Sequence, residues 1–238
     1  MKRSEINALM RDADAFMGQQ SFHLPPFAYW TPGDWKNKGE EVCEIVENGL
    51  GWDVTDFGSG DYDRHGLLLF TLRNGNPKNW EHMQGKLYAE KIMVVEVDQV
   101  TPMHFHWRKS EDIINRGGGN LMIQLYNATE DGSLANTDVT ISVDGVKRVV
   151  KAGGTLALRP GESIALHPRC YHKFWGAESR VLVGEVSSVN DDRIDNRFHK
   201  PTGRFPQIEE DEPPLYLLSA DYPRYYRPDR MLQLAAVA

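Results

Sequence analysis

Two histidines separated by one residue, His104 and His106, are the side chains of this 238-residue sequence best placed to bind a metal ion. On a β-strand, residues i and i+2 face the same side, so both imidazoles can reach one ion. Glu111 follows across a short turn and can add a carboxylate oxygen. Imidazole and carboxylate ligands together suit Mn, Fe, Co, Ni or Zn. The spacing therefore predicts a divalent metal site that needs one more ligand.

The fourth ligand must come from a distant strand, where His172 and His167 are the candidates. We predict a four-residue turn at residues 176–179 that joins two antiparallel strands and pairs His172 with Val183. Paired residues share a face of the sheet, so His172 would point inward together with Glu185, two residues beyond its partner. A register slip of one residue would reverse both assignments, and His167 stays open as the alternative.

Charged residues near these ligands are candidates for catalysis and substrate binding. Glu185 is the first candidate for a general base, because the predicted pairing aims its carboxylate inward beside the metal. Lys109 follows the histidine pair and is a candidate acid or electrostatic catalyst. Lys91 has the strand parity of Met93, on an otherwise apolar face, which predicts a buried polar role. Candidates for binding substrate hydroxyl groups follow the strand of Glu185: Asp191, Asp192 and Arg193. A solvated loop is the competing interpretation of that charged run.

Short β-strands separated by Gly, Asn and Asp must position these residues. Strands are predicted at residues 67–72, 86–97, 121–126, 139–143, 146–150, 155–158, 163–166 and 180–186. Asp144-Gly145 is a two-residue hairpin turn, and Gly117-Gly118-Gly119 is predicted to supply another reversal. This pattern is typical of an all-β sandwich or barrel.

The two ends of the chain differ from this central part. Residues 4–18 carry apolar side chains at helical spacing, with Ser4 as the predicted N-cap. Residues 22–35 are rich in proline and aromatic residues and are predicted to form an irregular arm near the contact of a homodimer, where an apolar surface would cover it. The tail from Arg204 onward has an acidic run at residues 209–212 and is predicted to be a solvated extension along the surface.

Composition argues against several classes of protein. The net charge of −7 is offset by no block of Lys and Arg, so nucleic acid is not an expected partner. No segment approaches the ~18 apolar residues of a membrane helix. Cys43 and Cys170 are too few for a disulfide framework and the N-terminus has no apolar leader, so we expect a cytoplasmic protein with free thiols. We expect one domain over residues 1–238, with N-terminal elements at 1–84, a barrel core at 85–190 and a C-terminal extension at 191–238.

The run from His104 to Gly118 resembles the first sequence motif of the cupins, in which two histidines, a glutamate and a glycine recur at this spacing. Only the glycine expected at the start of the motif is replaced, by Asp98. The second cupin motif can be placed on residues 161–176 with less agreement. Gly161 and His172 match there, whereas three positions depart from it: His167, Arg169 and Gly176. The resemblance implies an all-β cupin double-stranded β-helix, a jelly-roll barrel, with His172 as the fourth ligand.

Residues 104–119 and 184–193 look like the bacterial D-lyxose isomerases of the cupin class, and the likeness extends to the arm and to residues 209–218 of the tail. This resemblance implies a metal-dependent aldose-ketose isomerase that interconverts D-lyxose and D-xylulose, and D-mannose and D-fructose, by proton transfer through a cis-enediol. It also implies a homodimer, a free sugar as substrate, and Mn2+ as the ion, with Zn2+, Co2+, Ni2+ or Fe2+ as alternatives.

Two other functions fit the same ligand set. Cupin dioxygenases use three histidines and a glutamate, and a sugar-binding cupin needs no catalysis at all. The charged side chains predicted to face inward favour proton transfer on a polyol over oxygen chemistry. No helix-turn-helix or basic region accompanies the barrel as it would in a DNA-binding sugar sensor.

Overall fold

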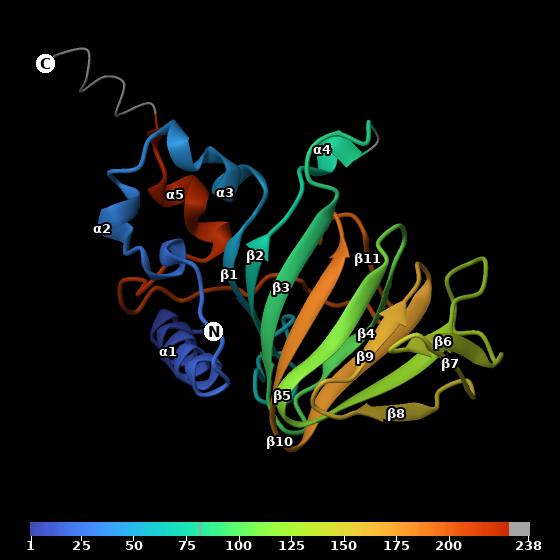
Figure 1. Ribbon diagram of the computed structural model, residues 1–238. Helices are drawn as coiled ribbons and strands as arrows, with labels where there is room; N and C mark the ends of the chain where they lie inside the picture. Colours follow the sequence, from blue (N-terminus) through green and yellow to red (C-terminus); the bar gives the residue numbers. More distant parts are fainter. Residues whose placement is uncertain (81, 229–238) are drawn as a thin grey trace, which may run out of the picture.

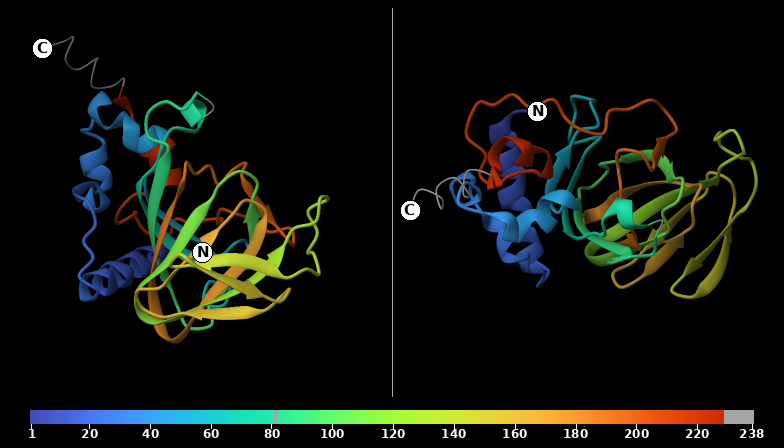
Figure 2. Two further views of the ribbon diagram at one scale, coloured as in Figure 1. Left: turned by 45° about the vertical axis from the view of Figure 1, so that its right-hand side comes forward. Right: turned by 90° about the horizontal axis from the view of Figure 1, so that it is seen from above.

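Antiparallel β-strands form the centre of the molecule, and most of its helices gather on one side of them (Figures 1 and 2). The computed structural model describes residues 1–80 and 82–228. The single domain predicted over residues 1–238 includes residue 81 and residues 229–238, which lie outside the described residues.

The strands and helices of the described residues follow one another along the chain from α1 to α5. The strands are β1 (Gly51–Thr55), β2 (Leu67–Arg73), β3 (Tyr88–Val95), β4 (Thr101–His106), β5 (Glu111–Asn127), β6 (Val139–Val143), β7 (Val146–Val150), β8 (Thr155–Leu158), β9 (Ser163–Leu166), β10 (Cys170–Ser188) and β11 (Asn196–Phe198). The helices are α1 (Arg3–Gln19), α2 (Pro32–Trp35), α3 (Cys43–Glu47), α4 (Pro77–Trp80) and α5 (Tyr222–Tyr225), with 3₁₀ turns η1 (Pro26–Tyr29), η2 (Glu40–Val42) and η3 (Ser219–Asp221). The predicted bounds of β6, β7, β8 and β9 are confirmed.

Two long strands, β5 and β10, join the two walls of the barrel. The second half of β10 pairs with β3 and with the first half of β5, whereas its first half pairs with β4 and with the second half of β5. Apolar side chains of both walls meet in one buried core, which contains Leu69, Ile113, Ile123, Phe174 and Val183. The predicted strands at 121–126 and 180–186 are therefore parts of longer strands. The all-β jelly-roll prediction is confirmed.

The predicted reversals at residues 117–119 and 176–179 are both wrong, because these segments lie inside β5 and β10 and face each other across the ladder. Gly118 has a φ of 91°, and a Cβ atom there would collide with the carbonyl oxygen of Arg180. Gly119 is likewise crowded by the backbone of Ala177 and Ser179. These glycines permit a close approach of two backbones at the bend between the walls. Flexible turns also favour glycine, which is why the sequence suggested a turn here.

A β-bulge in β10, and not the predicted hairpin, turns both His172 and Glu185 toward the inside of the barrel. Ala177 pairs with Asn120 and Val183 pairs with Asn115, so β10 has one residue more than β5 between these two pairs. Because side chains alternate along a strand, one extra residue shifts the inward parity from even positions such as His172 to odd positions such as Glu185. The orientation of both residues was predicted correctly, but for the wrong structural reason.

Helix α1 covers the outer face of the wall that contains β2 and β3. Its buried residues Ile6, Met10 and Met17 pack against outward-facing residues of that wall such as Phe70 and Ile92. Inward-facing residues alternate with these along each strand, as the two burial clusters show. This alternation places Lys91 on the inner face, as its parity predicted.

The acidic run of the tail holds the start of α1. Arg3 is 1% exposed and donates four hydrogen bonds of 2.9 Å to the carboxylates of Glu210 and Asp221. Ser4 is not the N-cap, because the helix begins at Arg3 and both the amide and the hydroxyl group of Ser4 donate to Asp211. Residues 209–212 are exposed, as predicted for a solvated extension along the surface, and ion pairs and hydrogen bonds to Arg3 and Ser4 bind this part of the tail to the helix.

The aromatic arm packs on the same chain. Trp35 is 1% exposed and stacks against Tyr222 of the tail, with ring centroids 4.6 Å apart. Leu217 and Val42 complete this small core. Much of the apolar surface that motivated a dimer contact is thus covered within one chain, and the homodimer stays a prediction. No helix in the described residues is both long and apolar enough to cross a membrane.

Candidate metal centre and active site

Three histidines meet inside the barrel. His104 and His106 come from β4, and His172 from the neighbouring strand β10, where it pairs with His104. Each ring offers a nitrogen atom within 4.8 Å of the other two, and all three residues are buried. Adjacent strands and the two-residue spacing therefore bring the imidazoles to one point, where they can hold a divalent metal ion.

Backbone carbonyl groups orient two of these rings. His104 Nδ1 lies 2.7 Å from the carbonyl oxygen of Pro102, and His172 Nδ1 lies 3.1 Å from that of Cys170. A carbonyl oxygen only accepts, so each Nδ1 carries the proton and Nε2 keeps its lone pair for a ligand bond. Burial, together with His172 and His106, lowers the pKa of His104 well below its usual value. The ring stays neutral, the form that binds metals.

Glu111, at the start of β5, faces the histidines with one carboxylate oxygen. Its Oε1 lies 3.0 Å from His172 Nε2 and 3.4 Å from His106 Nε2, and this buried oxygen has no hydrogen-bond partner among the described residues. The other oxygen lies 2.7 Å from Lys109 Nζ. Burial alone would raise the pKa of Glu111, but Lys109 and the imidazoles hold it well below its usual range. An ionised oxygen aimed at three imidazoles fits a metal ion.

His167, the alternative ligand, is exposed in the loop before β10, away from the cluster. The structure brings His172 and not His167 to the histidine pair. The motif position thus identified the histidine that lies in the cluster, although the other residues of the motif agreed poorly.

Two buried lysines hold a glutamate beside the histidine cluster. Glu185 Oε1 lies 2.8 Å from Lys109 Nζ and 3.5 Å from Lys91 Nζ. Burial would raise the pKa of Glu185, but the two ammonium groups outweigh it and lower the pKa. Asn190 Oδ1 accepts hydrogen bonds from both lysines, at 2.9 Å from Lys91 and 3.2 Å from Lys109. The structure therefore brings Glu185, Lys109 and Lys91 together as one network.

Asp192 joins this network to the tail. Its Oδ1 lies 3.5 Å from Lys91 Nζ, and its Oδ2 accepts a hydrogen bond of 2.8 Å from Arg204 Nη2. Arg204 Nη2 also donates to Asp53 at 2.6 Å, whereas its buried Nη1 has no partner among the described residues. The side chains of Asp191 and Arg193 instead pair with each other at 3.0 Å, with Arg193 74% exposed.

Sequence reasoning missed Asn190, Arg204 and Asp53. Arg204 lies in a proline-rich tail, and nothing in its immediate sequence indicates that it enters the barrel. Asn190 precedes the charged run at 191–193, so its position beside that run was the only available signal.

The histidine cluster and the lysine network line a cavity of about 40 Å³. Apolar residues, among them Leu69, Met93 and Phe198, share its lining with the charged groups. A site with neutral imidazoles, an ionised carboxylate and two ammonium groups can bind oxygen atoms, stabilise negative charge on them and accept a proton.

Comparison with known proteins identifies the family. A sequence model described as D-lyxose isomerase matches residues 1–222. A D-lyxose/D-mannose isomerase from Serratia proteamaculans is 52% identical over 228 residues, which cover 94% of this chain and 99% of that protein. A protein of the same name from Escherichia coli O157:H7 is 50% identical and covers 94% of this chain and 100% of its own length.

Solved structures with the same fold include L-ribose isomerases. One from Acinetobacter sp. DL28, a variant in complex with L-ribose, has a TM-score of 0.58 at 17% identity and covers 88% of this chain and 98% of its own. One from Geodermatophilus obscurus has a TM-score of 0.59 at 16% identity, with the same coverage. At this identity the likeness concerns the fold. The sequence matches, over nearly the whole length, show that the chain belongs to the D-lyxose isomerase family.

Proposed function

We propose that this protein interconverts D-lyxose and D-xylulose, and D-mannose and D-fructose, as a metal-dependent ketol isomerase. The observation that supports this best is the juxtaposition of the histidine cluster with Glu185, held between Lys109 and Lys91 in one buried cavity. The names of the relatives from Serratia proteamaculans and Escherichia coli O157:H7 specify the two aldoses.

We assign the metal ligands as His104, His106, Glu111 and His172. These residues would hold a divalent ion through three imidazole nitrogens and one carboxylate oxygen. That ion would supply Lewis-acid stabilisation of negative charge on sugar oxygen atoms. Manganese suits mixed nitrogen and oxygen ligands, and we propose Mn2+ as the native ion, with Zn2+, Co2+, Ni2+ and Fe2+ as alternatives.

Glu185 is the proposed general base. Aldose-ketose isomerisation moves a proton between two adjacent carbons of the open-chain sugar, and one carboxylate can accept it from the first carbon and return it to the second. The two lysines lower the pKa of Glu185, so it is ionised and ready to accept a proton at neutral pH. Lys109 keeps its charge because Glu111 and Glu185 outweigh the burial of its ammonium group and raise its pKa. Its positive charge can stabilise the enediolate.

The remaining hydroxyl groups of the sugar require donors and acceptors. Lys91 and Asp192 are the proposed residues inside the cavity, and we add Arg204, whose unpartnered Nη1 can donate to a hydroxyl group. Asp191 and Arg193 are proposed to act at the rim, where their side chains line the neighbouring pocket. A homodimer and a cytoplasmic location remain part of the proposal, and light scattering that gives a monomer mass at micromolar concentration would reject the dimer.

A substrate panel tests the proposed function. The purified protein is treated with a chelator, loaded with Mn2+ and incubated with pentoses and hexoses while ketose formation is followed. We expect D-lyxose and D-mannose to react and the chelated sample to be inactive. Oxygen consumption without ketose formation would replace the isomerase proposal by an oxygenase.

A further inference from the structure

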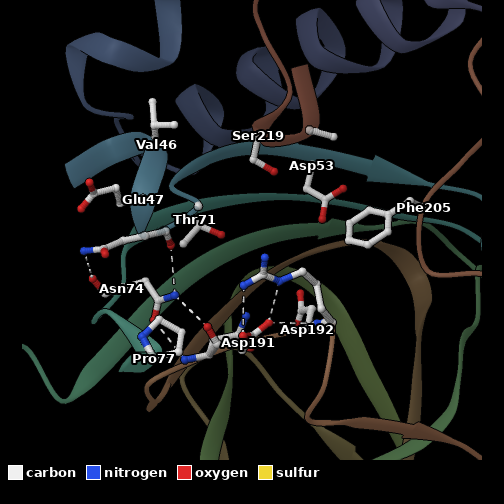
Figure 3. Close-up of a pocket in the computed structure, with 15 residues that line it drawn as sticks. Val46, Glu47, Asp53, Thr71, Asn74, Pro77, Asp191, Asp192, Phe205 and Ser219 are labelled. Atoms are coloured by element: carbon white, nitrogen blue, oxygen red, sulfur yellow. Dashed lines mark hydrogen bonds and ion pairs between the residues drawn. The ribbon is translucent and has the colours of Figure 1, made fainter. Parts of the chain in front are cut away.

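A larger pocket adjoins the small cavity of the candidate active site. It has a volume of about 320 Å³ and lies between the end of α3, strands β1 and β2, the segment after β10 and the tail (Figure 3). This is within the ~300 to 1,000 Å³ of small-molecule sites. The cavity at the histidines is smaller, at about 40 Å³. The pocket is therefore the roomier of the two spaces and the one with the volume usual for a bound small molecule.

The groups that line this pocket suit a neutral polyol. Thr71 is 6% exposed, and its hydroxyl group lines the pocket without a hydrogen-bond partner in the described chain. Asp53 and Ser219 lie on the same side, and Asp191 and Asp192 lie opposite (Figure 3). The 48%-exposed ring of Phe205 adds an apolar surface near Asp53 (Figure 3). Hydroxyl groups and carboxylates around one aromatic ring provide hydrogen bonds for sugar hydroxyls and contact for a sugar's C–H face.

The charges of the pocket disfavour ionic ligands. Four carboxylates against one guanidinium group repel phosphates and organic acids: Glu47, Asp53, Asp191 and Asp192 against Arg193. Three of these four carboxylates are also not free for a metal, because Asp191 pairs with Arg193, and Asp53 and Asp192 pair with Arg204. Among the described residues, the group that can hold an ion is the histidine cluster.

Asp192 forms part of the wall between the two spaces. It lines the pocket and the cavity alike, and its carboxylate reaches both Lys91 inside and Arg204. Arg204 in turn lines the cavity and pairs with Asp53 of the pocket. A ligand in the pocket can therefore contact the same carboxylate that pairs with Lys91, and Lys91 in turn pairs with the proposed base Glu185.

We propose that this pocket is a docking site for the closed-ring form of the sugar, outside the metal chamber. Sugars in water are mostly closed rings, whereas isomerisation requires the open chain, so the pocket would hold the ring before it opens and enters the metal chamber. The proposal rests on the proposed function for the identity of the ligand. It assigns Thr71, Ser219 and Phe205 to sugar binding, in addition to the residues of the chamber.

Methyl α-D-mannopyranoside tests the site, because its ring cannot open. Its binding to the full chain is measured by titration calorimetry and saturation-transfer NMR, with the protein either Mn2+-loaded or chelated. We expect similar affinity in both states, since the pocket contains none of the proposed metal ligands. Phe205→Ala should weaken binding about ten-fold through the lost aromatic contact. Ala220→Trp, which fills the pocket from its exposed rim, should abolish it.

Tyr88→Ala is the matched control, because Tyr88 is 50% exposed on the outer face of β3 and should leave binding unchanged. Four results would overturn the docking site. Binding could require the metal, or His172→Ala could remove it. Tyr88→Ala and Phe205→Ala could weaken binding equally, or the glycoside could fail to bind at all. Turnover of D-lyxose is assayed on the same samples. Glycoside binding without turnover would reject the proposed function and support the docking site, so the two failures differ.

Discussion

Two buried charge networks in this molecule differ in how completely their atoms are used. At the start of α1, the guanidinium group of Arg3 donates from all three of its nitrogen atoms, to Glu210 and Asp221. At the candidate active site, Arg204 Nη1 and Glu111 Oε1 are buried without a hydrogen-bond partner among the described residues.

This difference separates a structural network from a functional one. A buried polar group without a partner costs free energy, so a network that only stabilises a fold should satisfy its atoms. Unused atoms that converge on one cavity indicate that a ligand completes them. Substitutions in the Arg3 network should therefore affect stability alone, and substitutions at the barrel network should affect metal binding and activity first.

The largest effect is expected at a metal ligand. His172→Ala should remove most of the bound metal and abolish isomerase activity, because one of four proposed ligands is lost. His167→Ala is the control, since this exposed residue lies outside the cluster and should keep both properties. Metal content by elemental analysis and ketose formation measure the two effects. The reverse ranking of the variants would show that the ligand set is misassigned.

Glu185→Gln should lower the isomerase rate by about 10² to 10⁴-fold, because the amide keeps the shape of the side chain and cannot accept a proton. Metal content should stay at the wild-type level, which separates this variant from loss of a ligand. For the wild type, isomerisation in D2O should place deuterium in the product. A near-wild-type rate would transfer the role of base to another group in the cavity.

Arg3→Met should lower the free energy of unfolding by about 3 kcal/mol, because it leaves the buried carboxylate of Asp221 without its charged partner. Arg224→Ala, at the 64%-exposed edge of the same network, should cost less than ~1 kcal/mol. Urea denaturation measures both, and kcat at 25 °C should not change. A loss of activity in folded Arg3→Met would show that the two networks are coupled.

The smallest effect concerns pH. The hydrogen bonds and charge of Arg3 lower the pKa of Glu210 in the folded protein. The stability that Glu210 contributes is therefore fully present above its unfolded pKa of about 4.3, and it is lost as the pH falls through the lower folded pKa. Glu210→Gln should therefore be less stable than wild type at neutral pH, and this difference should shrink on acidification. Urea denaturation at several pH values measures it, and a difference independent of pH would assign it to packing instead.

Much of the site could be predicted from spacing, because the ligands depend on local alternation. His104 and His106 lie on one strand, and Lys91 keeps the parity of its apolar neighbours. Two residues that replace glycines of the cupin motifs still adopt the left-handed backbone conformation that favours glycine. Asp98 and Arg169 replace expected glycines and still adopt positive φ angles, of 59° and 65°.

The rest depends on contacts distant in sequence. A strand of 19 residues with a bulge looks like a hairpin in sequence, because the glycine and polar residues at its bend are those of a turn. Arg204 reaches the barrel through a tail whose path its composition does not specify. Trp35 is buried by Tyr222, nearly the whole chain away, so its exposure could not be judged from the arm itself.

The bulge at residues 177–181 has a consequence for how sequences of this family can change. Most insertions and deletions are tolerated at exposed, irregular positions, and Glu178, exposed with a φ of 70°, is such a position. In this strand, however, the length of the segment decides whether the proposed metal ligand His172 on one side of it and the proposed base Glu185 on the other both face the inside of the barrel. Loss of a single residue would rotate Glu185 out of the barrel and Val186 into it while His172 stayed in place. A one-residue deletion in β10 would thus reverse the orientation of every side chain after it in the strand. We expect homologues with such a deletion to have lost isomerase activity and to have kept metal binding.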